Sequence, residues 1–476
     1  MKKNYRYVLL GLFLAVAIGL GVFKIFYTPD IDSEDAAYVL AGSLQPRSAV
    51  ISFKTFRNAK VRVELSTEAI AYTDPLYSDY VQTEASNWFL GKVEIDSLTP
   101  NTQYYYRLEV NDSVRIFDGY SGTFKTPQEG AFSYNIAFAA CAKTGSDSKI
   151  FEQIASEEPL VYFNIGDLHY GDIDSDCVDN FAEAYYRVFS KPEQAALYRQ
   201  TAFAYMWDDH DYGNNDSGYQ ADCRSVALDM YKDFIPHYDL AFQKKDAPVS
   251  QAFTIGRLRF IMTDLRSYKI EPQYDGCERI SEGSNFGLDQ HLTWFKNEML
   301  KAKNAGQMVV WISGIPFINS EGGPNYKCDE DDDWGGFPEE RAEIASFVEK
   351  NNIPACILSG DAHMVAIDDG TNSAYGSVSG KGMPVFQAAP LDRYGSYKGG
   401  PYSHGYNAER GQYGFMEVQD NNGEEICIRW TAKNEDGGVV KNERGEPIQL
   451  EFCRKLPARK TGQKATAFKL MPKHDS

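Results

Sequence analysis

The sequence predicts a layered α/β fold that follows an N-terminal β-sandwich, and three observations support this. The chain has 476 residues, which is enough for two or more domains. Its first part, over 33–128, consists of short runs rich in β-branched and aromatic residues. From residue 132 onward, apolar runs alternate with helical segments, a pattern typical of α/β layers.

The first 28 residues read as a targeting segment. The basic stretch MKKNYR precedes an apolar stretch, Tyr7–Tyr27, that only Lys24 interrupts. Its roughly 21 residues would reach about 31 Å as a helix, close to the hydrocarbon thickness of a bilayer. Positive charge ahead of it predicts a cytoplasmic N-terminus and a chain that otherwise lies outside. We expect an uncleaved membrane anchor; the alternative is a cleaved signal peptide and a secreted protein.

The segment over 33–128 is predicted to be all-β. Residues that favour turns separate its apolar runs, which are AVISFK, KVRVELS, WFLGKVEI, QYYYRLEV and GTFKTP. The length allows about seven strands, the size of an immunoglobulin-like sandwich. The stretch IDSLTPNTQYYYRLEV resembles fibronectin type III modules, which implies a fibronectin III-like domain.

The segment over 132–456 is predicted to be the catalytic domain. Seven apolar runs have the length of buried strands: YNIAFAA, LVYFNIG, AFAYMW, RFIMTDL, MVVWISG, ACILSG and MPVFQAA. Apolar residues with a period of about 3.6 predict helices over 148–156, 179–189, 222–233, 288–304 and 338–351. A β-rich end follows, and the basic residues 457–476 are expected to be a disordered tail.

Charge and cysteine content narrow the possible partners. A net charge of -19 argues against a nucleic acid-binding surface and suggests either solubility or the binding of divalent cations. Eight cysteines in an exported chain favour disulfides, although one sequence does not determine their connectivity. We expect free thiols at Cys141 and Cys356, and the bridges Cys177–Cys223, Cys277–Cys328 and Cys427–Cys453.

Four of the apolar runs end in side chains that ligate metals. These are Cys141 after YNIAFAA, Asp167 to Asp172 after LVYFNIG, Asp208 to Asp216 after AFAYMW, and Asp361 with His363 after ACILSG. Ligands of open α/β sheets bind beyond the carboxyl ends of the strands, so we expect these clusters to converge at one sheet edge. Carboxylates brought together raise each other's pKa unless cations compensate them, so convergence predicts bound metal.

The mixture of residue types predicts more than one kind of metal ion. Carboxylates and amides favour calcium, magnesium or manganese, whereas a thiolate, a phenolate and an imidazole suit iron or zinc. Two metals held close together suit hydrolysis of a phosphate ester, because one generates hydroxide and both neutralise the phosphoryl oxygens.

The motifs NIGDLHYGD, MWDDHDYGNND, TDLRSY, DDWGGFPEER and LSGDAHM resemble those of the alkaline phosphatase D (PhoD-like) family of metallophosphatases. The resemblance covers the chain from about residue 33 to about residue 420. It implies a calcineurin-like layered β-sandwich flanked by helices and a centre of iron plus calcium. It also implies a phosphomonoesterase or a phosphodiesterase. Together with the N-terminal segment, this predicts extracytoplasmic hydrolysis of phosphate monoesters by a metal-bound hydroxide.

The resemblance also implies a role for individual residues. The expected metal ligands are Cys141, Asp167, Tyr170, Asp209, Asn214, Asp361 and His363. Among them Asp167 would bridge the metals, the thiolate, phenolate and imidazole would hold iron, and Asp209 and Asp361 would face calcium. His210 would bind the phosphate or protonate the leaving group as a general acid, and Arg266 would contact the phosphate.

Several alternatives stay open at the level of sequence. Asp208 and Asp211 either fix the neighbouring histidine or cap a helix, and the acidic run Asp329 to Asp333 is expected to be a solvated loop. A phosphodiesterase of phospholipase D-like specificity would use the same chemistry with a different pocket. A non-catalytic surface binding protein is the alternative from another class.

Overall fold

The computed structural model describes residues 36–114, 120–275, 278–281, 283–287, 289–319 and 332–459. The expected anchor over 1–28, most of the basic tail and the expected Cys277–Cys328 bridge lie outside this part of the chain. Within it, no helix combines the length and the apolar composition needed to cross a membrane.

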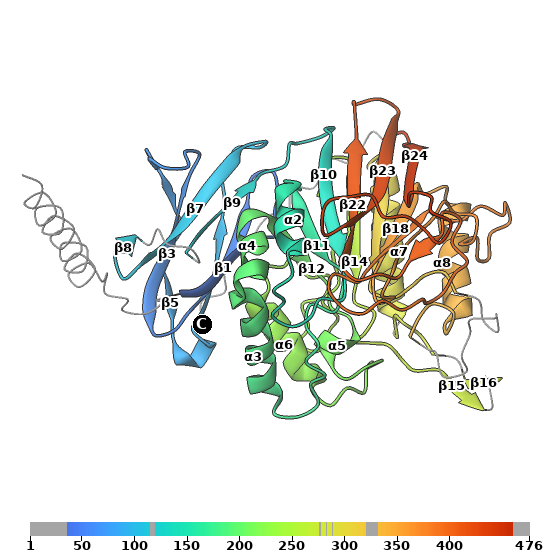
Figure 1. Ribbon diagram of the computed structural model, residues 1–476, viewed down its shortest axis with the longest axis horizontal. Coiled ribbons are helices and arrows are strands. Elements are labelled where there is room, and N and C mark those ends of the chain that lie inside the picture. Colours follow the sequence, from blue (N-terminus) through green and yellow to red (C-terminus); the bar gives the residue numbers. More distant parts are fainter. Residues whose placement is uncertain are drawn as a thin grey trace, which may run out of the picture.

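Two large sheets pack face to face and form the body of the molecule (Figure 1). The order of the first is β24 (Gln449–Lys455), β23 (Glu425–Asn434), β22 (Gln412–Gln419), β10 (Tyr134–Ala139), β11 (Val161–Asn164), β12 (Ala202–Tyr205), β1 (Ala36–Gly42), β2 (Ala49–Thr55) and β6 (Leu90–Ile95). The order of the second is β13 (Gln251–Ile255), β14 (Leu258–Thr263), β17 (Met308–Ser313), β18 (Ala355–Ser359), β20 (Val385–Ala388), β19 (Val365–Asp368) and β21 (Tyr406–Asn407).

Aromatic side chains join the inner faces of these two sheets. The rings of Phe138 and Phe386 lie 4.9 Å apart between centroids, and those of Phe163 and Phe260 lie 5.2 Å apart. The strands β10, β11 and β12 are mutually parallel, as are β14, β17, β18 and β20. Every residue of β11, β12, β17 and β18 is buried, which is why these segments read as continuous apolar runs rather than alternating ones.

Helices cover the outer faces of both sheets. On the first sheet lie α2 (Ile150–Ser156), α3 (Cys177–Ser190), α4 (Pro192–Gln200) and α6 (Arg224–Phe234), and on the second lie α7 (Asp289–Asn304) and α8 (Pro338–Lys350) (Figure 1). In α3 the buried residues recur three and four positions apart, so one stripe of the helix faces the core: Phe181, Ala184, Tyr185, Val188 and Phe189. The short helices η1 (Ala85–Asn87) and α5 (Asp209–Tyr212) lie in loops.

The N-terminal β-rich segment is joined to the first large sheet. Its strand β1 pairs with β12 in parallel, with Gly42 opposite Phe203. A further sheet covers β1 and β6 and contains β4 (Leu76–Tyr77), β3 (Ala59–Ser66), β7 (Gln103–Val110) and β8 (Ser113–Val114), with β5 (Val81–Thr83) beside β3 and β9 (Ser121–Lys125) beside β7. The hairpin of β15 (Gln273–Asp275) and β16 (Glu278–Ser281) is separate.

Most of the predicted elements are confirmed. All seven apolar runs of the catalytic segment are strands, and each of the five predicted helices lies within a few residues of its expected bounds. The sequence-based prediction missed several elements, among them β1, β13, β19, α4 and α5. The last is a single helical turn inside the acidic stretch MWDDHDYGNND, where no apolar periodicity marks a helix.

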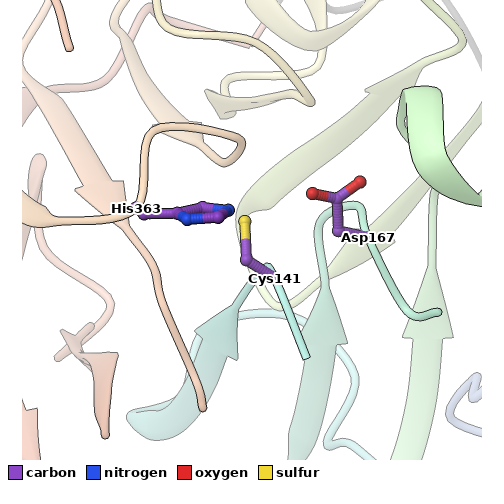
Figure 2. A group of neighbouring side chains, drawn as sticks. All are labelled: Cys141, Asp167 and His363. Atoms are coloured by element: carbon purple, nitrogen blue, oxygen red, sulfur yellow. The ribbon is translucent and has the colours of Figure 1, made fainter. Parts of the chain in front are cut away.

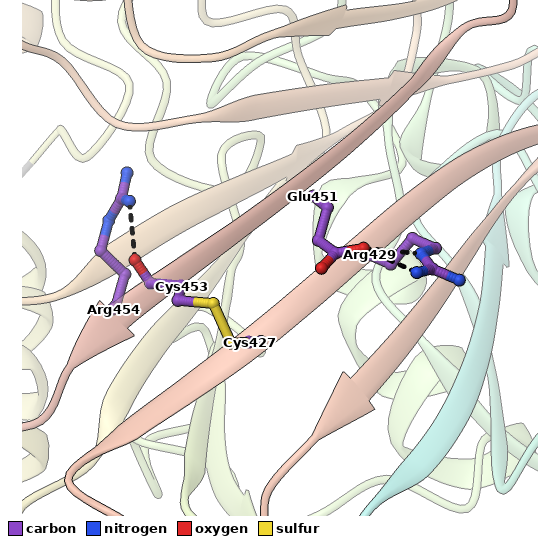
Figure 3. The surroundings of a disulfide bond; sticks show 5 residues. All are labelled: Cys427, Arg429, Glu451, Cys453 and Arg454. Carbon is purple, nitrogen blue, oxygen red and sulfur yellow. Dashed lines mark hydrogen bonds and ion pairs between the residues drawn. A yellow bond between two sulfur atoms is a disulfide. The ribbon is translucent and has the colours of Figure 1, made fainter.

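Two of the expected disulfides are confirmed. Cys177 at the start of α3 is bonded to Cys223 before α6, and Cys427 on β23 is bonded to Cys453 directly opposite on β24 (Figure 3). Beside the second bridge, Arg429 donates to the Glu451 carboxylate across the same pair of strands. The two remaining described cysteines, Cys141 and Cys356, are free and buried, as expected.

Candidate metal centre

The four ligand-rich loops meet at one end of the two packed sheets. Those after β10, β11 and β12 carry Cys141, Asp167 and Asp209, and the loop after β18 carries Asp361 and His363. The expectation of one sheet edge was wrong in this respect, because β18 belongs to the facing sheet. Convergence still follows, since both sheets point the carboxyl ends of these strands toward the same end of the sandwich.

Three of the candidate ligands lie where the backbone turns sharply after its strand. Cys141, Asp167 and Asp361 have φ of 63°, 53° and 60°, in the left-handed region that non-glycine residues adopt rarely and that clusters at functional sites. Gly166, directly before Asp167, has a φ of 121°, and a Cβ at this position would lie 2.6 Å from the Asp208 Cβ. Its missing side chain therefore allows the loops after β11 and β12 to approach.

Cys141, Asp167 and His363 form the first ligand group, with donor atoms within 4.8 Å of one another. Figure 2 shows the sulfur beside the imidazole, with the carboxylate entering from the neighbouring loop. The Tyr170 hydroxyl joins this group: it donates to Asp167 Oδ2 at 2.7 Å and lies 2.9 Å from His363 Nε2. The Tyr394 carbonyl lies 2.7 Å from His363 Nδ1 and accepts its proton, which leaves Nε2 as the ligand atom.

Asp208, Asp209 and Asp361 form the second ligand group, also within 4.8 Å. Asp167 and Asp209 fall into a further such group with His210, so the two ligand groups are contiguous. Lys398, on the loop between β20 and β21, lies 3.0 Å from each carboxylate oxygen of Asp361.

Burial perturbs the titration of these groups strongly. It raises the pKa of Asp361 to about 7 against the attraction of Lys398, and burial together with Asp209 raises the pKa of Asp167 well above its usual range. Burial likewise raises the pKa of the Cys141 thiol and lowers the pKa of His363 to about 4. The imidazole is therefore neutral near pH 7, as a metal ligand must be.

Orphaned carboxylate oxygens show that the cluster fits metal ions. Asp167 Oδ1, Asp208 Oδ2 and Asp209 Oδ1 are buried and accept no hydrogen bond from any described residue. Buried oxygens without a donor are costly unless a cation compensates them. The thiol, phenol and imidazole of the first ligand group suit a transition metal, and the three carboxylates of the second suit a hard cation.

His210 faces this cluster from the start of the acidic stretch. Its Nδ1 lies 2.5 Å from Asp172 Oδ1, and its Nε2 lies 3.9 Å from Asp209 Oδ2. The Asp172 carboxylate accepts the Nδ1 proton and so turns Nε2 toward the carboxylates.

Asp211 has a supporting role that agrees with the helix-capping alternative, whereas His210 is held by Asp172. One of its oxygens accepts from the backbone NH of Asp208 at 2.6 Å, as part of the capping box of α5. The other accepts from the Leu168 NH at 2.8 Å and from the Tyr205 hydroxyl at 2.6 Å. The carboxylate thereby ties the loop after β12 to the loop after β11.

Two expected site residues lie elsewhere than the sequence reading placed them. Arg266, expected to contact phosphate, is fully buried and is held by Asp208 at 2.5 Å and by Asp332 at 2.9 Å. Its donors are directed to carboxylates, so it acts as a buried counter-ion. Asn214, expected to be a metal ligand, is exposed and donates to Asp174 at 3.2 Å.

The sequence reading also missed residues that shape the site. Asp332 was assigned to a solvated acidic loop but is buried, and ion pairs with Arg266 and Lys269 lower its pKa although burial opposes them. Lys398 sits in a Gly- and Tyr-rich loop where no strand or helix pattern indicates which way it faces. Asp172 is among the residues expected after LVYFNIG, but its pairing with His210 is not predictable because the two lie 38 positions apart in sequence.

Comparison with known proteins identifies the family of the chain. The family model of PhoD-like phosphatases matches residues 136–399, which is more than half of the chain and includes every candidate ligand. Alkaline phosphatase D of Bacillus subtilis (strain 168) is 24% identical over 312 residues, covering 57% of this chain. That match spans 52% of the relative, so the chain matches only about half of its length.

Solved structures of low sequence identity share the fold. The structure of PhoD superposes with a TM-score of 0.69 at 17% identity, covering 88% of this chain and 95% of that one. The purple acid phosphatase PPD1 from yellow lupin (Lupinus luteus) superposes with a TM-score of 0.56 at 11% identity, covering 89% and 74%. The mixed α/β fold with several sheets is therefore that of these phosphatases, and the chain belongs to the PhoD-like phosphatase family, a family of phosphoester hydrolases.

Proposed function

We propose that this chain is an extracytoplasmic, metal-dependent phosphatase that hydrolyses phosphate monoesters. The observation that carries the proposal is the contiguity of two chemically different ligand groups through Asp167 and Asp209. A two-metal arrangement of this kind is the usual clamp for attack on a phosphate ester.

Iron and calcium are the proposed metals. Cys141, Asp167, Tyr170 and His363 would hold iron, with Asp167 bridging, and Asp209 and Asp361 would hold calcium together with Asp208. The free buried oxygens of Asp167, Asp208 and Asp209 support this division. When bound, the metals supply neutralising charge for the phosphoryl oxygens and lower the pKa of water. Asn214 is left out of the proposed ligand set because its side chain is exposed.

The protein's own residues orient the ester and move the proton. His210 donates its Nε2 proton to the leaving alkoxide, while Asp172 holds Nδ1 and stabilises the imidazolium before transfer. Without metal, the Tyr170 hydroxyl orients Asp167 and His363; with iron bound, its oxygen would be a ligand instead. Arg266 holds Asp208 in place from within the core.

The proposed location outside the cytoplasm rests on the disulfides and on the N-terminal sequence. Two disulfides in the described chain suit an oxidising compartment. The apolar segment Tyr7–Tyr27 would either anchor the protein or direct its secretion. The N-terminal β-rich segment is proposed to be fibronectin III-like, which its two facing sheets support.

Activity and metal content together test the proposal. The purified full chain is assayed on p-nitrophenyl phosphate before and after chelation, and again after iron and calcium are restored. Asp167→Asn and His210→Gln are compared with Asp436→Asn, an exposed carboxylate paired with Lys149. We expect loss of activity on chelation and in the first two variants, with lower metal content only in Asp167→Asn. Hydrolysis that survives both variants, or metal-replete protein without activity, would contradict the proposal; the second result would favour a surface binding protein.

The choice between monoesters and diesters needs its own measurement. Relative rates on p-nitrophenyl phosphate and bis(p-nitrophenyl) phosphate separate the proposed phosphomonoesterase from a phosphodiesterase of phospholipase D-like specificity. A faster rate on the diester would replace the proposed activity with the alternative one.

A further inference from the structure

Arg393 lies beside the first ligand group, on the loop between β20 and β21. Its Cζ is 3.8 Å from the centroid of the Tyr170 ring, whose hydroxyl donates to Asp167. A guanidinium stacked on a tyrosine is held in one orientation without losing its hydrogen-bond donors. Arg393 thus places a positive charge of fixed position next to Tyr170, a proposed ligand of the iron.

No described residue neutralises this charge. Among the described residues, none accepts a hydrogen bond from Arg393 or forms an ion pair with it, and its Nε is buried without a partner. The two other cations at the site differ, because Arg266 is bound by Asp208 and Asp332, and Lys398 is bound by Asp361. A buried donor without an acceptor is unfavourable, so Arg393 suits an anion that arrives from outside the chain.

The neighbouring backbone fixes the position of Arg393 relative to the ligands. The carbonyl of Tyr394, the next residue, accepts the Nδ1 proton of His363. Asp392, the preceding residue, accepts from Ser146 and from the backbone NH of Lys143 in the loop after β10. The loop that carries the guanidinium is therefore bound to ligand loops of both sheets.

We propose that Arg393 binds a terminal phosphoryl oxygen of the substrate and thereby selects monoesters over diesters. This inference rests on the proposed function. A monoester has three non-bridging oxygens, and two of them are neutralised by the metal pair, so the third is left for the guanidinium. In a diester, one of these oxygens carries a second organic group and no charge. The guanidinium of Arg393 then has no anionic oxygen to bind. Arg393 takes the phosphate-binding role that the sequence reading gave to Arg266.

Two substitutions of Arg393 and one matched control test the inference. Arg393→Gln removes the charge, and Arg393→Lys keeps the charge but removes the planar fork. Arg410→Gln removes a half-exposed arginine on a nearby loop, 3.9 Å from Asp392, and so controls for a general loss of positive charge. The holoenzyme of each variant is assayed for kcat/KM on p-nitrophenyl phosphate and on its bis ester, and its metal content is measured.

The expected result is selective for the monoester. Arg393→Gln lowers kcat/KM on the monoester by roughly 10- to 100-fold, as loss of a charge-assisted hydrogen bond predicts, and changes the diester by less than about 3-fold. For Arg393→Lys, kcat/KM on the monoester lies between the values of Arg393→Gln and the wild type. For Arg410→Gln it equals the wild-type value. Equal losses on both esters, loss of bound metal, or an unchanged monoester rate would each overturn the inference.

Binding of inorganic phosphate separates failure of this inference from failure of the proposed function. Phosphate raises the melting temperature of a metal-loaded protein that binds it. We expect this rise in the wild type and in Arg410→Gln and its loss in Arg393→Gln. If the wild type hydrolyses neither ester, the proposed function fails, and the phosphate-dependent rise still decides whether Arg393 binds the anion. A rise that persists in Arg393→Gln rejects the assignment.

Discussion

The ionisation of Asp361 is expected to lower the free energy of unfolding of the metal-free protein as pH rises. Burial raises its pKa from 3.8 to about 7, so between these values the folded chain keeps a proton that the unfolded chain has lost. The free energy of unfolding therefore decreases with pH in this window and is level above it. A shift of about 3 units corresponds to about 4 kcal/mol, of which about 3 kcal/mol falls above pH 5.

The assay is urea unfolding of chelated protein at about pH 5 and about pH 8, for the wild type and Asp361→Asn. Between about pH 5 and about pH 8, the free energy of unfolding of the wild type should fall by about 3 kcal/mol relative to that of Asp361→Asn. Saturating metal abolishes the wild-type dependence, because the bound cation favours the ionised carboxylate.

Asp332→Asn serves as the control. Its pKa is lowered, so its own contribution to stability is complete above about pH 4. Its charge also raises the pKa of Asp361, so the variant should keep a decrease in stability with pH, but a smaller one than the wild type. If Asp361→Asn and the wild type show the same pH dependence, the argument that Asp361 is buried without sufficient compensation is refuted.

Of three further predictions, two concern the surroundings of the metal centre and one concerns a disulfide at the sheet edge. Asp172→Asn should lower kcat about 10- to 100-fold with little change in KM, because His210 loses support for its imidazolium; an unchanged kcat in steady-state kinetics would contradict this. Gly166→Ala should cost at least about 2 kcal/mol and reduce metal content, since φ is 121° and the added Cβ meets Asp208 at 2.6 Å; a wild-type denaturation midpoint would argue against it. Serine at both ends of the disulfide between β23 and β24 should remove about 3 kcal/mol, the loop-closure value for 26 residues, measured by denaturant unfolding; equal stability would show that the strand pairing suffices.

The positions of the proposed strand-end ligands could be predicted because they depend on local sequence. Cys141, Asp167 and Asp361 each follow an apolar run directly, and the direction of a parallel strand decides at which end of the sheet they lie. Their assembly from two sheets could not be read in the same way. The apolar runs of β11 and β18 look alike, and only long-range pairing assigns each to its sheet.

Charged residues in the loops could not be assigned, because their partners are distant in sequence. The stretch TDLRSY predicts that Arg266 contacts phosphate. In the structure Arg266 is fully buried and donates to Asp208 and Asp332, which are 58 and 66 positions away in sequence. Lys398 and Arg393 share one loop, but Lys398 forms an ion pair with Asp361 and Arg393 stacks on Tyr170. Local composition carries no information on that difference.

The pairing of β1 with β12 affects how the protein can be divided. A truncation that begins at residue 129 would remove β1, β2 and β6 and leave β12 as an open sheet edge. Because every residue of β12 is buried in the intact chain, this new edge would be apolar and free to pair with another molecule. The shortened chain is therefore expected to aggregate before its chemistry can be measured, so the smallest workable enzyme includes the β-rich N-terminal segment.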